Sequence, residues 1–455
     1  MTKSDKFSSI FFRSRGFFFL LIGMCSLLCV NCDNYMVQYL LPIPPELPKY
    51  TVTFITNVSG LLVPPQTVTQ GRFAFRPTPP NRPGWTLTEW YTDNGTFKNK
   101  WDFAKTRVTK HTALFAHWSE ITVDPVAVTF VTNVEGLHVP PHLVVPGRTA
   151  TEPTPPLRKG YDLEGWYSDA SLANKWNFAA MPVSAAMPLY AKWVFAMVPV
   201  PGGTFEMGRD LGGGVSESTT QTVTLTSFQM SRYEITQEQY RLVMGSGNMP
   251  AGLTYGGGNY WPIYFVSWYG ALKFCNTLSM REGLAPVYRI NNSTDPLAWG
   301  TVPNNNSAAW NAVTMVPGAN GYRLPTEAQW EYAAKGGNGT PGNSYAGAGS
   351  DKADDVGWYI GNSGGRTAVV GNKKPNNLGL YDMSGNVCEW CWDWFVPYAG
   401  GTQSDPLGAS SGLTRVYRGG GHGDGETFLR SVSRLGNPPQ NTFFDIGIRV
   451  VRPAQ

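Results

Sequence analysis

Charged residues and cysteines are scarce in this 455-residue chain. Only 15% of its residues are Asp, Glu, Lys or Arg, against roughly 25% in an average globular protein. Three of the six cysteines fall within residues 25–32, so only Cys275, Cys388 and Cys391 remain for the folded part of the chain. Three thiols cannot form a disulfide framework, so hydrophobic cores must hold the domains together.

Long apolar runs and basic patches are missing as well. No stretch of about 20 apolar residues, the length that crosses a bilayer, occurs beyond the N-terminus, which excludes a polytopic membrane protein. The net charge of +4 comes mostly from residues 1–31, and the remainder has 32 basic against 31 acidic residues. Because a nucleic-acid partner needs a basic face, we expect none.

Residues 1–31 are predicted to be a lipoprotein signal peptide. Four basic residues precede the apolar run Phe17–Val30, whose 14 residues are too few for a stable membrane anchor. The run leads into Cys29-Val30-Asn31-Cys32, which resembles a relaxed, spirochaete-type lipobox.

The lipobox resemblance implies an outer-membrane lipoprotein, held at the cell surface by a lipid on Cys32. Cys25 and Cys29 are alternative acceptors, because the small residue that usually precedes the cysteine is missing. An ordinary signal peptide is the other interpretation. Residues 32–48 contain four prolines and are predicted to be a stiff tether.

Two stretches of about 70 residues are near-copies of each other. Three phrases recur in the same order: Thr53–Val58 as Thr129–Val134, Pro77–Pro80 as Pro153–Pro156, and Trp90-Tyr91 as Trp166-Tyr167. Each copy opens with alternating apolar and polar residues, which is typical of a half-buried strand. The units, residues 49–119 and 125–194, resemble the Listeria–Bacteroides repeat of bacterial surface proteins. That resemblance implies a small β-grasp-like fold and a spacer role, with adhesion as the alternative.

Beyond residue 194 the sequence predicts three helices in a domain made mostly of loops. Thr236, Ser267 and Thr326 each precede a helical pattern, and Gln239 has the reciprocal position of a capping box behind Thr236. The rest consists of short strands and long loops rich in Gly and Asn. Aromatic packing and polar contacts must hold such loops in place.

Six phrases of this domain occur in a characteristic order: Pro201–Gly208, Tyr233–Thr236, Gly321–Tyr332, Asn376–Trp390, Arg418–Gly420 and Ile446–Val450. Their order and spacing resemble the formylglycine-generating-enzyme (sulfatase-modifying factor) family across residues 196–452. The resemblance implies an α+β, C-type-lectin-like fold for residues 195–455. The whole chain is therefore expected to be this domain preceded by two small β-grasp-like repeats.

The residues that would carry the family's chemistry are missing. For an enzyme, the resemblance implies two copper-binding thiols a few residues beyond Arg418–Gly420, whereas residues 421–430 contain no cysteine. Because thiolates are the ligands that select Cu(I), we expect no copper. Four of the five histidines lie in the repeats, so the histidine cluster of the related iron sulfoxide synthases is missing too. A formylglycine-generating or related oxidative enzyme is therefore the second interpretation.

Calcium is the one metal that the sequence favours. Cys388 and Cys391 lack the two further ligands that zinc needs, so both thiols are predicted to be buried hydrophobic groups. The family resemblance implies a Ca²⁺ site built from two carboxylates and three main-chain carbonyls: Asp382, Glu389, Met383, Gly385 and Val387. Oxygen ligands on a glycine-containing loop suit this hard cation. Alternatively, the two carboxylates cap turns.

The stretch from about residue 415 to 449 also resembles the variable region of surface proteins that retroelements diversify on this scaffold. The resemblance implies error-prone copying of Asn-rich codons, which never yields Lys, Met, Gln, Glu or Trp. The candidate ligand contacts, aligned on Arg418–Gly420 and Arg430, are Tyr417, His422, Gly423, Asp424, Gly425, Thr427, Phe428, Ser433, Leu435, Gly436, Phe443, Phe444 and Asp445. That family usually has Trp in place of His422. Glu426 and Gln440, which such copying cannot produce, are assigned to the framework.

The sequence thus predicts a non-catalytic, lipid-anchored surface protein that displays a diversified binding site to a protein or glycan ligand. Alternatively, the stretch from about residue 415 to 449 is a degenerate enzyme loop, and Phe443 and Phe444 then belong to the core. A purely structural envelope protein is a third interpretation. In the preferred one, loop side chains can change because arginines hold the backbone: Arg418, Arg430, Arg434 and Arg449.

Overall fold

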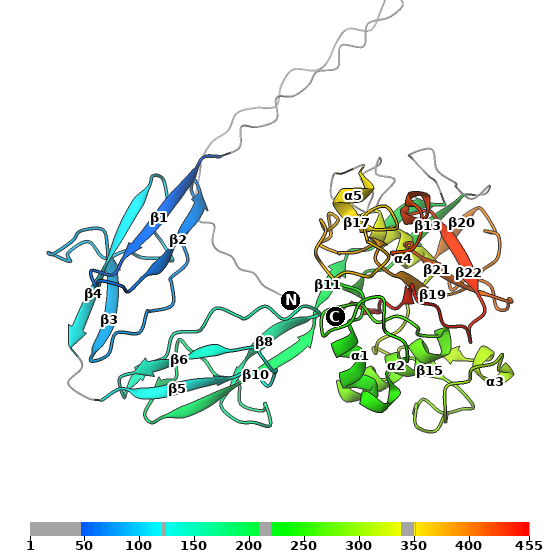
Figure 1. Cartoon of the computed structure of the whole chain (residues 1–455), viewed down its shortest axis with the longest axis horizontal. Helices are drawn as coiled ribbons and strands as arrows, with labels where there is room; N and C mark the ends of the chain where they lie inside the picture. The colour runs from blue at the N-terminus through cyan, green and yellow to red at the C-terminus, as the bar shows by residue number, and fades with distance from the viewer. Residues whose placement is uncertain (1–46, 121–123, 209–219, 338–349, 351, 455) are drawn as a thin grey trace, which may run out of the picture. The chain divides into compact units, whose positions relative to one another are not determined.

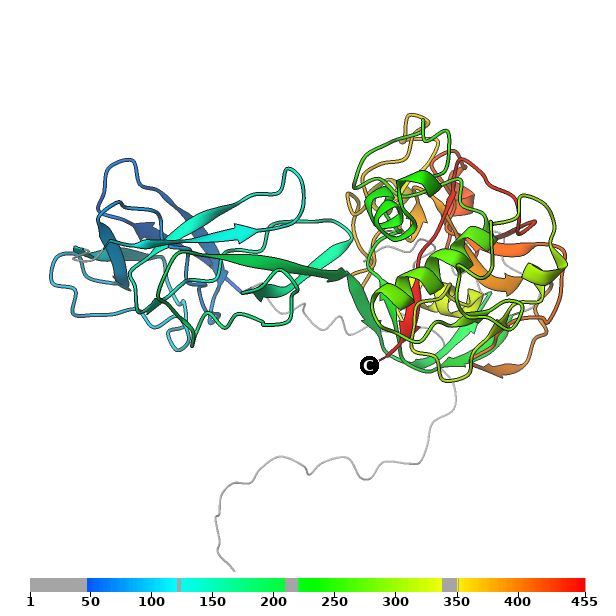
Figure 2. The ribbon, with the colours of Figure 1, turned by 90° about the horizontal axis from the view of Figure 1, so that it is seen from below.

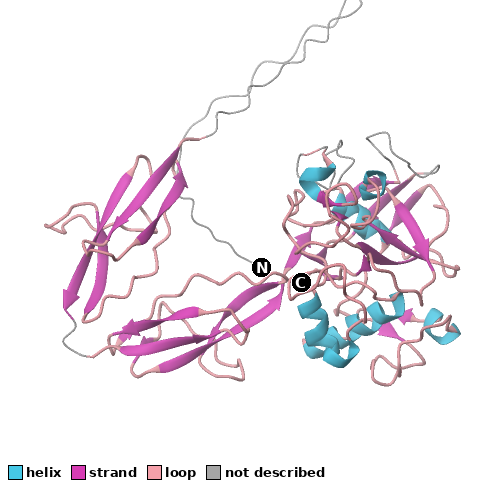
Figure 3. Cartoon of the chain, viewed as in Figure 1, coloured by secondary structure: helices cyan, strands magenta, loops and turns pink. Residues whose placement is uncertain are grey.

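The computed structural model describes residues 47–120, 124–208, 220–337, 350 and 352–454 (Figure 1). The predicted signal peptide, the candidate lipidation sites Cys25, Cys29 and Cys32, and nearly the whole tether lie outside these residues. Within the described part of the chain, no helix has the length and apolar character needed to cross a bilayer. The described helices all belong to the C-terminal domain (Figure 3).

The first repeat is a four-stranded sheet in the order β2-β1-β4-β3. Its strands are β1 (Lys49–Ile55), β2 (Val63–Thr69), β3 (Trp85–Tyr91) and β4 (Thr112–Glu120). Val52 and Phe54 are buried whereas Thr53 between them is exposed, which is the half-buried strand that the sequence predicts. Phe54 meets the buried Trp90 edge-on, with ring centroids 5.0 Å apart.

The second repeat has the equivalent strand order, β6-β5-β10-β8. Its strands are β5 (Val126–Val131), β6 (Val139–Val144), β7 (Arg148–Thr149), β8 (Tyr161–Tyr167), β9 (Pro182–Val183) and β10 (Met187–Phe195). β10 runs parallel to β5 and antiparallel to β8. The Trp118 indole donates to the oxygen of Thr56 at 2.8 Å, and Trp193 donates to Thr132 at 3.0 Å. The repeat seen in the sequence is therefore also a repeat of hydrogen bonds.

Three small sheets form the frame of the C-terminal domain. One joins both ends of the domain: β11 (Met197–Val200), β14 (Phe228–Ser231) and β24 (Val451–Pro453). The second consists of β12 (Gly203–Met207), β13 (Gln221–Leu225) and β20 (Thr402–Ser404). The third has the order β22 (Arg434–Asn437), β21 (Arg415–Arg418), β19 (Cys388–Trp394) and β23 (Ile446–Gly447). Two strand pairs complete the set: β15 (Tyr288–Arg289) with β16 (Thr314–Met315), and β17 (Gly357–Trp358) with β18 (Ser384–Gly385).

The three predicted helix starts are confirmed. α1 (Gln237–Met244) and α4 (Glu327–Ala334) each begin with a capping box, formed by Thr236 with Gln239 and by Thr326 with Gln329. α2 (Trp268–Arg281) begins after Ser267, whose side chain accepts from the main-chain N–H of Gly270. The shorter helices are α3 (Ala308–Asn311), α5 (Ala353–Val356) and the 3₁₀ turns η1 (Ser246–Asn248) and η2 (Glu426–Leu429).

Two hydrophobic cores flank the four-stranded sheet. α1 and α2 lie side by side (Figures 1 and 2), and Tyr240 of α1 stacks on Phe274 of α2 with centroids 5.4 Å apart. Tyr417 of β21 packs against this core, whereas its neighbour Val416 belongs to the core that contains Trp330 of α4. Successive side chains of a strand point to opposite faces, so β21 contributes alternately to the two sides of the sheet.

Candidate ligand-binding site

Buried arginines fix the start of the predicted variable region. The fully buried Arg418 donates from Nε to Glu327 Oε1 of α4 at 2.9 Å. Its Nη1 donates to the main-chain oxygens of Ser431 and Ser433 at 2.7 and 2.9 Å. Arg434 of β22 forms a second ion pair with Glu327, with Nη2 2.7 Å from Oε2. These bonds tie β21, β22 and α4 together on both sides of the intervening loop.

A further buried arginine fixes the end of the region. Arg449 Nε lies 2.8 and 2.9 Å from the two carboxylate oxygens of Glu389 on β19. The Trp330 indole donates to Glu389 Oε2 at 2.6 Å. Arg449 also donates to the main-chain oxygens of Ser231 and Tyr381. The framework role predicted from the sequence is thus confirmed for Arg418, Arg434 and Arg449.

The pair Gly419 and Gly420 turns the chain out of β21. Both residues have positive φ, at 94° and 69°, a conformation that side chains rarely adopt. A Cβ on Gly420 would lie 2.9 Å from the main-chain oxygen of Phe428, and one on Gly419 would lie 3.2 Å from the ring of Trp330. The loop that follows therefore starts from a turn that requires glycine.

Tyr417, Asp424 and Asp445 come together around Cys388 at the start of β19. One ligand atom each of Cys388, Asp424 and Asp445 lies within 4.8 Å of the other two. Asp424 Oδ2 accepts from the N–H of Gly421 at 2.8 Å, and Cys388 Sγ lies 3.5 Å from the same oxygen. Burial raises the pKa of the Tyr417 hydroxyl, and the nearby Cys388, Asp445 and Asp424 raise it further.

Neither carboxylate of this cluster forms an ion pair with a described residue. Burial raises the pKa of Asp445 to about 6, and the charge of Asp424 contributes to the rise. Burial also raises the pKa of the Cys388 thiol, which therefore stays protonated at neutral pH. Cys388 and Cys391 are both buried, as predicted. The partly exposed cluster presents negative charge and hydrogen-bond acceptors to a ligand.

Aromatic rings form the neighbouring part of the site. His422, Phe444 and Tyr255 pack in a triangle, with centroids 5.0 to 5.7 Å apart. A Cβ on Gly423 would lie 3.2 Å from the Phe444 ring. His422 is only 1% exposed, and its Nε2 has no hydrogen-bond partner among the described residues. Because burial lowers the pKa of its imidazole, His422 is a neutral part of the wall behind the surface residues.

Sequence reasoning missed Tyr255. Its only local signal is an aromatic residue directly before three glycines, a pattern that indicates a loop but not what the loop contacts. The ring reaches Phe444 from a segment almost two hundred residues away in the chain.

One further candidate borders the cluster. Leu435 pairs with Tyr417 across β22 and β21, so both side chains lie on one face. Phe443 is 41% exposed, and its side chain makes none of the described contacts of the cluster. We call the residues that the structure brings together the Tyr417 face: Tyr417, Gly423, Asp424, Leu435, Phe444 and Asp445.

The remaining candidates lie elsewhere. Gly425, Thr427 and Phe428 belong to η2 and its N-terminal edge, where the Ser433 hydroxyl donates to the oxygen of Thr427 at 2.7 Å. Gly436 lies on the opposite side of the sheet from Tyr417, because a Cβ there would be 2.7 Å from both the Phe395 ring and Thr414 Oγ1. The structure therefore does not bring Gly436 to the Tyr417 face.

The carboxylates proposed for calcium lie in a buried acidic group. Asp382 Oδ2 accepts from the N–H of Gly371 at 2.6 Å, and its Oδ1 has no hydrogen-bond partner among the described residues. Glu234, which sequence reasoning missed, accepts from the N–H of Val387 at 2.9 Å. Burial raises the pKa of Asp382 to about 6 and that of Glu234 well above its usual range. The unpaired oxygen and the surplus of carboxylates fit a cation.

Glu389 fits calcium less well, because Arg449 and the Trp330 indole already use both of its oxygens. The main-chain N–H groups of Gly385 and Val387 bond to Gly419 and Glu234. These bonds do not involve the carbonyl oxygens that the prediction assigns to calcium. Met383, the third carbonyl donor, is buried. Calcium at Asp382, Met383, Gly385, Val387 and Glu389 stays a prediction.

Comparison with known proteins covers both parts of the chain. Residues 186–454 match the family model described as sulfatase-modifying factor enzyme 1-like domain, and residues 50–117 and 127–192 match the Listeria-Bacteroides repeat domain. "Chaperone protein LppX" of Paenibacillus barcinonensis is 40% identical over 216 residues, which are 44% of this chain and 71% of that protein. The formylglycine-generating enzyme of Streptomyces coelicolor is 29% identical over 306 residues, which cover 61% of this chain and 94% of the enzyme.

A solved structure supports the fold. "Treponema denticola variable protein 1" is 31% identical and superimposes with a TM-score of 0.51, covering 57% of this chain and 95% of that one. The C-type-lectin-like fold and the two repeats predicted from the sequence are therefore confirmed. The chain belongs to the family of proteins with a sulfatase-modifying factor enzyme 1-like domain, here preceded by two Listeria–Bacteroides repeats.

Proposed function

We propose that this protein is non-catalytic and binds a protein or glycan ligand through the Tyr417 face. The observation that carries the proposal is that Tyr417, Asp424 and Asp445, from three separate segments, meet on a frame of buried arginine pairs. The ion pairs of the frame do not involve these side chains, so the side chains can change while the pairs remain. Partly exposed aromatic and polar side chains on a fixed backbone are well suited to carry binding energy.

The proposal includes diversification of this face. The similarity to "Treponema denticola variable protein 1" supports it, as does the absence of Lys, Met, Gln, Glu and Trp from the candidate positions. Sequencing of sibling alleles and of neighbouring DNA tests it. We expect differences concentrated in residues 417–445, together with a reverse transcriptase and a near-copy of this coding region. Alleles that are identical throughout 417–445 would refute diversification.

A lipid anchor on Cys32 completes the proposal, and it would display the domain at the outer surface of the cell. The basic N-terminus, the short apolar run and the cysteine at its end support this placement. Metabolic labelling with a fatty acid tests it: the wild-type chain should be labelled and a Cys32→Ser variant should not. If the Cys32→Ser variant is still labelled, the lipid is attached to Cys25 or Cys29 instead.

Binding by the Tyr417 face can be tested on glycan and surface-protein arrays with three forms of the full chain. We expect a ligand of the wild-type protein to bind at least about tenfold more weakly to a Tyr417→Ala/Asp424→Asn double variant, since such contacts carry most of the binding energy. A Leu297→Ala variant, altered at an 82% exposed side chain outside this face, should bind like the wild type. A ligand that binds all three forms equally contradicts the proposal, and the lack of any ligand favours a structural envelope protein.

An oxidative enzyme is the second candidate, because a formylglycine-generating enzyme is among the relatives. Residues 421–430 contain no cysteine, and the nearby Cys388 thiol is buried with a raised pKa. A thiol in that state is neither a good nucleophile nor a ready copper ligand. Incubation with copper and a cysteine-containing peptide separates the candidates, since the binding proposal predicts no oxidation of the peptide.

A further inference from the structure

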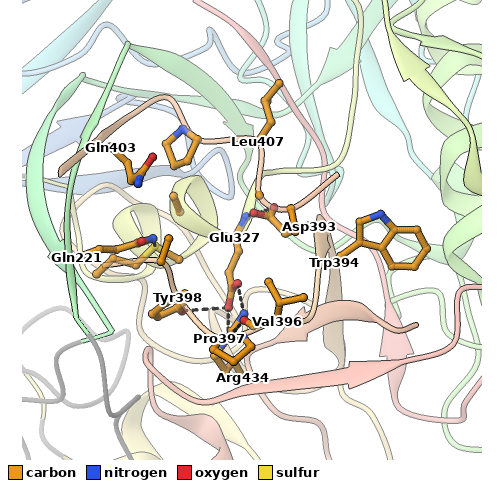
Figure 4. Close-up of a pocket in the computed structure, with 16 residues that line it drawn as sticks. Gln221, Glu327, Asp393, Trp394, Val396, Pro397, Tyr398, Gln403, Leu407 and Arg434 are labelled. Carbon is orange, nitrogen blue, oxygen red and sulfur yellow. Dashed lines mark hydrogen bonds and ion pairs between the residues drawn. The ribbon is translucent and has the colours of Figure 1, made fainter. Parts of the chain in front are cut away.

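A cavity of about 270 Å³ lies beside the first turn of α4 (Figure 4). Its walls include the charged residues Glu327, Asp393 and Arg434 and the apolar residues Trp394, Pro397 and Leu407. No residue of the Tyr417 face lines it, so an argument about this cavity is independent of the proposed function. Mostly apolar cavities with a few fixed polar groups are typical of small-molecule sites.

The ion pair in the cavity is already satisfied. Glu327 accepts from Nε and Nη2 of Arg434, each at 2.7 Å, and from the Tyr398 hydroxyl at 3.1 Å. Its side chain runs from the main chain beside Asp393 toward Arg434 and Tyr398 (Figure 4). Arg418 donates to the same carboxylate. Neither charge of the Glu327–Arg434 pair therefore needs a ligand.

Asp393 is different, because one of its two oxygens is unused. Oδ2 accepts from the main-chain N–H of Glu327 at 2.7 Å, where α4 begins. Oδ1 receives no hydrogen bond from any described residue, although the side chain is only 6% exposed and lines the cavity. This oxygen is not fully enclosed, so a donor that enters the cavity can reach it. An unpaired carboxylate oxygen favours such a donor.

The surroundings of Asp393 leave its charge without a direct partner. Four charged groups act on it, and none of them forms an ion pair with it among the described contacts: Glu327 of α4, Arg434 of β22, Arg415 of β21 and the buried Arg323. Burial and the charge of Glu327 raise the pKa of the Asp393 carboxyl to about 7. Gly408 has no side chain to cover Oδ1. A Cβ at this position would lie 2.6 Å from the oxygen and would block it.

Apolar side chains complete the cavity around this oxygen. Trp394 and Pro397 line it, and Leu407, 55% exposed, lies at its solvent side. A ligand that fills this volume must therefore be small, largely apolar, and able to donate one hydrogen bond to Asp393. A neutral alcohol would donate a hydrogen bond to Oδ1 but would not neutralise the charge of the Asp393 carboxylate. An ammonium group does both.

We infer that the cavity is a binding site for a small organic ammonium compound, whose N–H group donates to Asp393 Oδ1 and whose apolar body packs against Trp394, Pro397 and Leu407. Arg434 and Glu327 position the carboxylate and take no part in recognition.

Titration calorimetry of the full chain tests this inference with two matched pairs of probes, benzylamine with benzyl alcohol and cyclohexylamine with cyclohexanol. At pH 8 we expect each amine to bind at least about tenfold more tightly than its alcohol, because a hydrogen bond to a charged group is stronger than a neutral one. The affinity for the amines should fall by about tenfold from pH 8 to pH 6, as Asp393, with its pKa of about 7, takes up a proton.

Three variants separate recognition from folding. Asp393→Asn should abolish the preference for amines and its pH dependence, and Leu407→Ala should weaken amines and alcohols alike. Asp355→Asn, altered at a surface carboxylate that pairs with Lys374, should leave both unchanged. Equal binding of amines and alcohols, or no binding of either because the cavity holds only water, overturns the inference. The pH profile of the wild type decides the matter even if Asp393→Asn does not fold.

Discussion

Arg449 and Glu389 form a pair in which a fully buried guanidinium Nε lies within 3 Å of both carboxylate oxygens, at 2.8 and 2.9 Å. The pair joins β19 to the segment that leads into β24, at the end of the predicted variable region. Both side chains are at most 1% exposed, so neither charge can be hydrated once its partner is lost.

Glu389→Gln should therefore lower the free energy of unfolding by about 3 kcal/mol or more, because it leaves a buried charge without its partner. Chemical denaturation followed by tryptophan fluorescence measures the change. Lys374→Ala, which removes the exposed pair with Asp355, is the control and should cost less than about 1 kcal/mol. Equal effects of the two variants would show that the buried pair does not hold the frame.

Two glycines of the variable region should respond differently to the same substitution. Gly420→Ala places a Cβ 2.9 Å from the oxygen of Phe428 at a φ of 69°, which should destabilise the domain by about 1–3 kcal/mol. Gly425→Ala meets nothing within 4 Å at a φ of −73°, so its effect should be close to zero. Thermal unfolding of both variants checks this, and similar melting temperatures would contradict the assignment of Gly420 to the framework.

The free energy of unfolding should decrease as the pH rises from about 4 to about 6, because of Asp445. Its pKa rises from 3.8 to about 6 on folding. As the pH rises through this range the unfolded chain loses the proton while the folded one still holds it, so the unfolded state is favoured increasingly. Asp445→Asn should therefore be more stable than the wild type by about 1–2 kcal/mol at pH 7. The difference should vanish below about pH 4, where the carboxyl is protonated in both states. Unfolding curves that differ by a constant amount at pH 4, 5.5 and 7 would contradict this.

Calcium should raise the melting temperature of chelated protein by several degrees if Asp382 binds it, because a ligand of the folded state stabilises that state. Differential scanning calorimetry in millimolar Ca²⁺ measures the shift, and Mg²⁺ at the same concentration should reproduce little of it. Asp382→Asn should remove the response. No response in the wild type would mean that the proposed calcium site is absent.

Local signals in the sequence predicted the local features well. A helix start is visible in four consecutive residues, because Thr236 and its N3 partner Gln239 form a capping box. The same holds for Thr326. The repeats were predictable because each copy carries its own strands and its own tryptophan. Motif order then gave the fold of the domain, and the arginines at the ends of the variable region were correctly assigned to the frame.

Contacts between distant segments could not be predicted. Tyr255 precedes a glycine run that indicates a loop but not its contacts. Glu234 lies in the phrase Tyr233–Thr236, which indicates the family but not that this carboxylate lies near Asp382. Gly436 was placed with Tyr417 because permitted residue types say nothing about the face of β22 on which a residue lies. Asp393 escaped notice for a related reason: its unused oxygen depends on how α4 docks on β19.

The alternation along β21 and β22 has a consequence for how this gene can evolve. Tyr417 and Leu435 lie on one side, whereas Val416, Arg418 and Gly436 lie on the other. Tolerance to mutation should therefore alternate in the middle of these strands: Tyr417 and Leu435 are open to drift, whereas Val416, Arg418 and Gly436 are under purifying selection. At the strand ends the buried Arg415 and Asn437 are restricted as well. A lineage could replace the side chains at Tyr417 and Leu435 in this way while inheriting the frame residues beside them unaltered.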